Sequence, residues 1–142
     1  MLTQRSRYAL RAMLYLTEQP ATGPVPMNRI AVQANVPRKF LELILADLRE
    51  AGFLMSTRGK MGGYRLARAA HLISLGEIIR VIEGPLALVP CVSRTAYRSC
   101  LDCKDESACA IRHAMARVRD ETARILDGTS LADAVAEERA AA

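Results

Sequence analysis

Apolar residues recur every three or four positions along much of this 142-residue chain, which is the spacing of an amphipathic helix. The clearest case runs from Pro37 to Gly52, where one apolar stripe lies beside charged positions. This stripe consists of Phe40, Leu41, Ile44, Leu45 and Leu48. Similar stripes predict helices over residues 5–17 and 27–35, and Pro37 separates the second helix from the third. Two helices joined by so short a break have the shape of a helix-turn-helix.

A different pattern follows the third helix. In the stretch FLMSTRGKMGGYRLA, short strand-like runs over residues 53–57 and 64–67 flank a tip rich in glycine. Glycine permits the positive backbone φ angles of a tight hairpin, and Arg58 and Lys60 place positive charge around the tip. The sequence therefore predicts a mainly α fold with a small β-hairpin wing, a winged helix-turn-helix. The alternative is a structural hairpin that closes a small α+β core.

The second half of the chain contains further helical patterns. Ser74 and Glu77 have the spacing of a capping box, which opens a helix that ends at Gly84. A long helix after residue 109 carries a narrow apolar seam with heptad-like spacing, and such a seam favours pairing with a partner helix. The seam consists of Ile111, Met115, Val118, Thr122 and Ile125. A short last helix either docks back or frays.

The charge distribution indicates which kind of partner the protein binds. The chain carries a net charge of +5, but residues 1–65 hold ten Lys or Arg against four acidic residues. A localised positive excess favours nucleic acid, and a membrane is not expected because the chain has no apolar run long enough to span one. The alternative is a solvated basic face without a partner. We therefore expect a DNA-binding domain at residues 1–84 and a cysteine loop with a dimerisation helix at residues 85–142.

The candidate DNA-binding residues lie at the start of the third helix, in the wing and on the first helix. They are Arg38, Lys39, Phe40, Glu42, Arg58, Lys60, Gly62, Gly63, Arg5 and Arg7. The second helix of the pair enters the major groove, where basic side chains donate to guanine or phosphate and Glu42 accepts from the cytosine amino group. The alternative for Glu42 is an ordinary surface charge. The wing is placed for the minor groove or the backbone, whereas Arg49 is expected to support its own helix.

Candidate metal chemistry is confined to one polar segment. All four cysteines of the chain, Cys91, Cys100, Cys103 and Cys109, lie within PCVSRTAYRSCLDCKDESAC. We expect a cytoplasmic protein with reduced thiols, so metal binding is favoured over disulfides. The spacing leaves an iron–sulfur cluster, zinc and redox-active thiols open, with the cluster preferred because it tolerates loose spacing. A thiol–disulfide enzyme is a distant alternative because no base is placed beside the CxxC pair, and we expect no catalysis.

Several motifs resemble those of the Rrf-type winged-helix transcription regulators. The stretches RYALRAMLYL, FLELILADLREAGFL, STRGKMGGYRLA, ISLGEIIRVIEG and TSLADAV follow the family's pattern over nearly the whole chain. The resemblance implies a homodimer that binds a near-palindromic operator, more often as a repressor than as an activator. It also implies that three loop cysteines hold an iron–sulfur cluster, as in many members. By position these are Cys91, Cys103 and Cys109.

This chain departs from the family pattern around the fourth ligand. Arg112 and Arg7 stand where members of the family carry a ligating His or an acidic residue, so Cys100 is the replacement that the resemblance suggests. The alternatives for Cys100 are a bystander or a thiol that captures an oxidised neighbour. Gain or loss of the cluster is expected to alter the spacing of the two recognition helices and, with it, DNA affinity.

Overall fold

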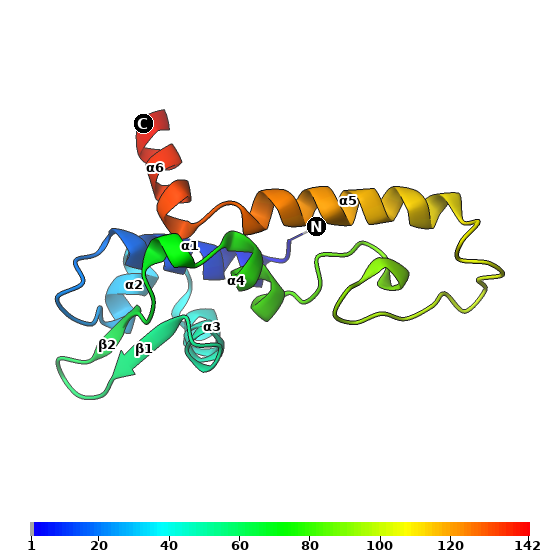
Figure 1. The fold of residues 1–142 in the computed structure, drawn as a ribbon. Coiled ribbons are helices and arrows are strands. Elements are labelled where there is room, and N and C mark those ends of the chain that lie inside the picture. Colours follow the sequence, from blue (N-terminus) through cyan, green and yellow to red (C-terminus); the bar gives the residue numbers. More distant parts are fainter. Residues whose placement is uncertain (1) are drawn as a thin grey trace.

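The computed structural model describes residues 2–142, which form six α-helices, two short 3-10 helices and one two-stranded hairpin (Figure 1). In chain order the elements are α1 (Gln4–Glu18), α2 (Met27–Gln33), α3 (Arg38–Glu50), β1 (Leu54–Thr57), β2 (Gly63–Leu66), η1 (Ala70–Leu72), α4 (Leu75–Ile82), η2 (Pro90–Val92), α5 (Ala110–Asp127) and α6 (Leu131–Ala141). The expected fold class, mainly α with a small β-hairpin wing, is confirmed.

One apolar core holds the helix-turn-helix together. Its fully buried members include Met13, Ile30, Leu41, Ile44, Leu45, Leu48 and Ile78. The second helix ends at Gln33 rather than at the expected Asn35, because Asn35 adopts a left-handed φ of 53°. Pro37 is the N-cap residue of α3, which suits a residue without a backbone N–H. The turn between α2 and α3 therefore follows from two local backbone preferences.

Phe40 departs from the expected apolar stripe of α3. Its spacing groups it with the core residues, but its side chain is 46% exposed. The ring stacks on Tyr8 of α1, with 5.8 Å between the ring centroids. Phe40 lies at the edge of the stripe, where a helix meets its neighbour rather than the interior. The Phe40 ring therefore contributes to the packing of α3 against α1.

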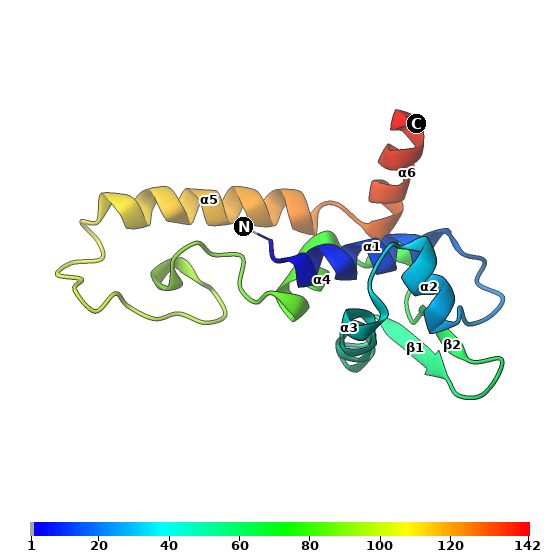
Figure 2. The same ribbon diagram turned by 180° about the vertical axis from the view of Figure 1, so that it is seen from behind.

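The wing is an antiparallel hairpin in which Leu54 pairs with Leu66 and Thr57 with Gly63. The first strand begins one residue later than expected and ends as expected, while the second lies one residue earlier than expected. Tyr64 exchanges two hydrogen bonds, of 2.8 and 2.9 Å, with the backbone of Val25. The wing is thus tied to the segment that precedes α2, and both views show it beside α3 (Figure 2).

The second half of the chain contains a projecting helix and a docked one. α5 extends away from the helix-turn-helix, with the 85–109 segment running along it (Figures 1 and 2). None of its residues is buried, and Ile111, Val118 and Ile125 are exposed. In contrast, α6 returns to α1 and buries Leu131 and Val135. The division at residue 84 stays a prediction.

The expected capping box of α4 is present. The Ser74 side chain accepts from the Glu77 backbone, and the Glu77 carboxylate accepts from the Ser74 backbone. Gly84 follows the helix with a φ of 107°, as expected for a left-handed stop. Within residues 2–142, no helix has the length and apolarity needed to cross a bilayer.

Candidate DNA-binding surface and cysteine cavity

A basic hollow lies between the start of α3 and the wing. Four cationic side chains line it, Arg38, Arg49, Arg58 and Lys60, together with Asn28 at the start of α2. The guanidinium of Arg38 donates a 2.6 Å hydrogen bond to Asn28 Oδ1. This bond fixes the orientation of Arg38 relative to α2. The hollow is the part of the first half where the positive charge converges, which suits phosphate binding.

The exposed face of α3 adjoins this hollow. Lys39 and Glu42 are exposed on the first turns of the helix. The Lys39 ammonium lies 4.9 Å from the centroid of the Phe40 ring, a cation–π distance. Phe40 therefore positions Lys39 as well as packing on α1.

The two candidate arginines of α1 are already engaged. The Arg5 guanidinium forms an ion pair with Asp47 of α3, and Arg7 donates a 3.2 Å hydrogen bond to Gln4. Both side chains are exposed. Because Arg5 is paired with Asp47, it contributes to the packing of α1 on α3 and adds less free positive charge than its sequence position suggests.

Two glycines of the wing are required by close backbone approaches. A Cβ on Gly62 would overlap the Thr57 carbonyl oxygen, and a Cβ on Gly63 would overlap the Val25 carbonyl. Gly63 also has a φ of 155°. These residues therefore shape the wing and attach it to the domain, which allows Arg58 and Lys60 to project from the tip.

All four cysteines line one cavity of about 410 Å³ beside the start of α5. Cys91 is buried in η2, Cys100 and Cys103 are exposed in the loop, and Cys109 is the N-cap residue of α5. The Cys109 sulfur accepts a 3.4 Å hydrogen bond from the Arg112 backbone. The chain thus brings thiols from a span of nineteen positions, 91 to 109, to one place.

The electrostatics of this cavity disfavour ionised thiols. The Cys91 sulfur beside Cys100 raises the pKa of the Cys100 thiol, with partial burial and Cys103 acting in the same direction. Desolvation raises the pKa of the Cys103 thiol, and Glu106 and Cys109 add to this. Thiolates in this cavity therefore repel one another, and a bound cation relieves such repulsion.

The donor set fits an iron–sulfur group, which binds through cysteine thiolates. Four thiols share the cavity with Arg112, whose Nε is buried without a hydrogen-bond partner. Within the part of the chain that the structure describes, however, no three His, Cys, Asp or Glu side chains converge closely enough to hold a metal ion. The four thiols therefore line one cavity, but they do not surround a single point at metal-binding distance.

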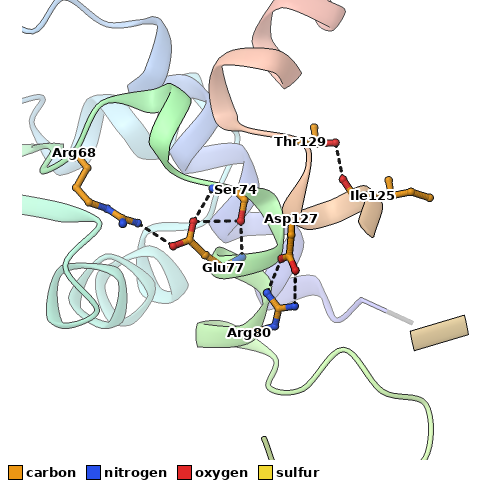
Figure 3. Close-up of polar contacts among 7 residues, drawn as sticks. All are labelled: Arg68, Ser74, Glu77, Arg80, Ile125, Asp127 and Thr129. Carbon is orange, nitrogen blue, oxygen red and sulfur yellow. Dashed lines mark hydrogen bonds and ion pairs between the residues drawn. The ribbon is translucent and has the colours of Figure 1, made fainter. Parts of the chain in front are cut away.

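Two separate sets of polar contacts join α4 to the end of α5 and to the segment after the wing (Figure 3). Arg80 of α4 donates hydrogen bonds of 2.6 and 2.9 Å to the Asp127 carboxylate at the end of α5. One turn away on α4, Glu77 accepts a 3.3 Å hydrogen bond from Arg68, which follows β2. α4 is therefore held by charged contacts on both sides.

Sequence reasoning missed two residues of the basic hollow and one residue that pairs with a side chain of the cysteine cavity. Arg49 was expected to support its own helix, but it lines the basic hollow, and Asn28 was not singled out. An arginine eleven positions after Arg38 completes about three helical turns and so lies on the same face, which is a signal that the periodicity offered. Glu106, which pairs with Arg112 at 3.5 Å, had no comparable signal.

Taken together, the helix-turn-helix, the basic hollow and the attached wing define a winged-helix DNA-binding protein. Comparison with known proteins identifies the group within this class. The chain belongs to the Rrf2 family, described as iron-dependent transcriptional regulators, whose family model matches residues 2–137. The resemblance inferred from the motifs is thus confirmed, and the chain is a transcriptional regulator of this family.

Individual relatives agree with this assignment. An Rrf2-like HTH-type transcriptional regulator of Rhodobacter capsulatus is 42% identical and covers 96% of this chain and 93% of its own length. The structure of CymR, the global cysteine regulator of B. subtilis, matches with a TM-score of 0.79 and 31% identity, covering 96% of this chain and 97% of that one. The structure of T. potens IscR matches with a TM-score of 0.75 and 28% identity, covering 97% and 88%.

Proposed function

We propose that this protein is a homodimeric repressor that binds a near-palindromic operator and senses iron, redox state or nitric oxide through an iron–sulfur cluster. Cys91, Cys103 and Cys109 would hold the cluster, with Cys100 as the fourth ligand. The observation that carries the proposal is the common cavity of the four cysteines, in a family described as iron-dependent. A bound cluster supplies reversible electron transfer, and its stability depends on iron and oxidants.

The basic hollow supports the DNA-binding part of the proposal. Arg38, Lys39 and Glu42 would face base edges in the major groove, while Arg58 and Lys60 would follow the minor groove or the phosphates. Gly62 and Gly63 give the wing its shape, and Phe40 positions Lys39. Arg5 and Arg7 would lie nearest the flanking phosphates. Asn28 and Arg49 join this set because they line the same hollow.

The exposed seam of α5 supports a homodimer. A long helix that buries none of its own residues and exposes Ile111, Val118 and Ile125 has an apolar face available for a second copy. Pairing through α5 would carry two recognition helices to two half-sites of one operator, which explains why the operator would be near-palindromic.

The same helix would couple the two sites. Cys109 caps its first turn and Asp127 ends its last, while Asp127 is bound to Arg80 of α4. A change at the cysteines that shifts or rotates α5 would therefore act on α4 and, through Glu77 and Arg68, on the wing (Figure 3). Because both half-sites must be met at once, a small change in this geometry alters affinity.

Anaerobic purification with iron and sulfide analysis tests the cluster. We expect a brown protein with visible absorbance and acid-labile sulfide, and Cys91→Ser, Cys103→Ser and Cys109→Ser variants without either. Cys100→Ser should retain less cluster than wild type if Cys100 is a ligand. Leu101→Ser, a neighbouring exposed residue, serves as the control. A colourless wild-type protein with stoichiometric zinc would exclude the cluster.

A direct thiol switch is the second candidate. Cys91 and Cys100 line the same cavity, which favours disulfide formation between them, and the B. subtilis relative CymR is a global cysteine regulator. In that case oxidation of the metal-free protein would produce a Cys91–Cys100 disulfide by mass spectrometry and change DNA affinity. A protein whose affinity responds to the cluster but not to thiol oxidation excludes this candidate.

A further inference from the structure

One buried side-chain nitrogen of a residue that lines the cysteine cavity has no hydrogen-bond partner. Across residues 2–142, Arg112 Nε is the only buried side-chain nitrogen or oxygen atom without a hydrogen bond. Its distance to Glu106 Oε2 is 3.5 Å, which is close enough for ion pairing but not for a good hydrogen bond. A buried N–H donor left unpaired costs about 1–3 kcal/mol. A native structure retains such a group where a ligand, an ion or a redox centre uses it.

The contacts around Arg112 hold this side chain at the cavity. Its backbone N–H donates to the Cys109 sulfur at 3.4 Å, and its side chain lines the same cavity as the four thiols. Glu106 pairs with Nε of the guanidinium, while the Tyr97 hydroxyl donates to Glu106. The Tyr97–Glu106 pair therefore lies on the Nε side of the guanidinium, and the 3.5 Å between Nε and Glu106 Oε2 gives an ion pair without a hydrogen bond.

A surface ion pair does not account for this arrangement. Arg94 and Arg124 form ordinary exposed pairs with Asp120 and Glu121, and their side chains are 74% and 69% exposed. The Arg112 side chain is only 33% exposed, and it lines the cavity that the four cysteines share. Glu106 compensates the positive charge of Arg112 but does not accept a hydrogen bond from its buried Nε–H. Because the Arg112 side chain also lines the cysteine cavity, an acceptor bound in that cavity would supply the missing hydrogen bond.

We propose that Arg112 recognises the anionic sulfur of the cofactor: its Nε–H donates to sulfur of the iron–sulfur cluster, and its charge raises the cluster's reduction potential. This inference rests on the proposed function. A cluster held by thiolates is anionic, and burial of an anion requires a nearby cation or donor. Arginine suits this role because it stays protonated in proteins. Hydrogen bonds to sulfur and local charge are among the factors that set cluster potentials.

The direction of the effect follows from the charge change. On reduction, one electron from the titrant enters the cluster, no bond is formed or broken, and the negative charge increases by one. A fixed cation stabilises the more negative state more strongly. Removal of the Arg112 charge must therefore lower the reduction potential.

Anaerobic potentiometric titration with dithionite, followed by visible absorbance, tests this role. We expect Arg112→Gln to shift the midpoint to a more negative value, and Arg112→Lys, which keeps the charge without the Nε donor, to shift it less. Arg117→Gln is the matched control because Arg117 is an exposed arginine of the same helix outside the cavity. It removes an equal charge and should leave the midpoint close to that of wild type.

The outcomes separate the two proposals. Equal midpoints for wild type and Arg112→Gln, or equal shifts for Arg112→Gln and Arg117→Gln, overturn the role of Arg112 while the cluster stands. A wild-type protein that takes up no cluster overturns both. If Arg112→Gln folds with the circular dichroism of wild type but takes up no iron, the cation is needed to hold the anion, which supports the inference. If Arg112→Gln does not fold, the midpoint and the iron content of Arg112→Lys are compared with those of wild type instead.

Discussion

Gly63 lies where the backbone of the wing passes against the segment before α2. Tyr64 and Val25 exchange hydrogen bonds there, and the space beside Gly63 is filled by the Val25 carbonyl and the Pro26 nitrogen. At this position a side chain is excluded by backbone atoms, which cannot move away as a side chain can. The identity of a single residue thus determines how the wing is attached.

Gly63→Ala should destabilise the protein by about 1–3 kcal/mol, because the added methyl group forces the wing away from Val25. Chemical denaturation of the two proteins measures this difference. Gly23→Ala is the control, since a Cβ on Gly23 meets nothing within 4 Å, and its stability should change by less than about 0.5 kcal/mol. Equal effects of the two substitutions would contradict the close approach at Gly63.

Glu42→Ala should relax base preference at one position of each half-site. The carboxylate favours a cytosine amino group and repels phosphate, and a good base contact discriminates by about 1–3 kcal/mol. Selection from random duplexes measures the preference, while affinity for the best site should change little. Glu50→Ala, an exposed residue at the other end of α3, should leave the selected sequence unchanged. An unaltered profile for Glu42→Ala would mean that Glu42 is an ordinary surface charge.

At the scale of elements, α4 is the connection between the projecting helix and the DNA-binding core. Gly76 lacks a Cβ and so leaves room for the Asp127 carboxylate, which both nitrogens of the Arg80 fork contact (Figure 3). The capping box of Ser74 and Glu77 stabilises the other end of α4. This arrangement joins α5 to α4 by a paired contact of fixed geometry, which is stronger than a single exposed ion pair.

A double-mutant cycle of Arg80→Gln and Asp127→Asn should give a coupling energy of about 0.5–1 kcal/mol at neutral pH, since both side chains are partly exposed. The hydrogen bonds from Arg80 lower the pKa of Asp127. Their contribution is therefore complete above about pH 4, the ordinary pKa of Asp, and is lost as the pH falls through the lowered pKa.

The more exposed pair of Arg124 and Glu121 is the control for this cycle. Its coupling energy should be smaller, because surface pairs contribute little. Denaturation curves at several pH values provide the data. A coupling between Arg80 and Asp127 that is absent at neutral pH, or that grows on acidification, would exclude the stabilising role of this contact.

At the scale of the whole molecule, the exposed seam of α5 supports the proposed homodimer. Three of the residues in the predicted seam, Ile111, Val118 and Ile125, are exposed, while α6 packs on α1. In the proposed dimer, the apolar seam of this helix would be buried against a second copy. Two DNA-binding domains joined in this way would bind one operator more tightly than either domain binds alone.

Val118→Glu should convert the dimer into a monomer, because it places a charge in the middle of the seam. Sedimentation equilibrium reports the mass, and affinity for a two-half-site operator should fall by about a hundredfold or more. Arg117→Glu also adds a negative charge to α5 but lies off the seam, so this variant should stay dimeric. A Val118→Glu protein that remains a dimer would show that the copies pair elsewhere.

Much of this protein is determined by its sequence alone. The spacing of apolar residues determines α1, α3 and α5, and Pro37, Gly52 and Gly84 set helix boundaries, because helix periodicity and backbone preferences act over a few residues. Clustering of the cysteines and the basic excess likewise lie within short segments. The class of protein and its two candidate sites therefore follow from local patterns.

Only the tertiary structure decided which side chains meet across elements. In the structure Phe40 stacks on Tyr8 rather than lying in the core. Asn28 and Arg49 line the basic hollow, and Arg112, which pairs with Glu106, lines the cavity of the thiols. These contacts depend on how the helices pack against one another and on the course of the 85–109 loop. Such long-range geometry is a property of the whole packed chain, and of these residues only Arg49 had a local signal, its helical spacing from Arg38.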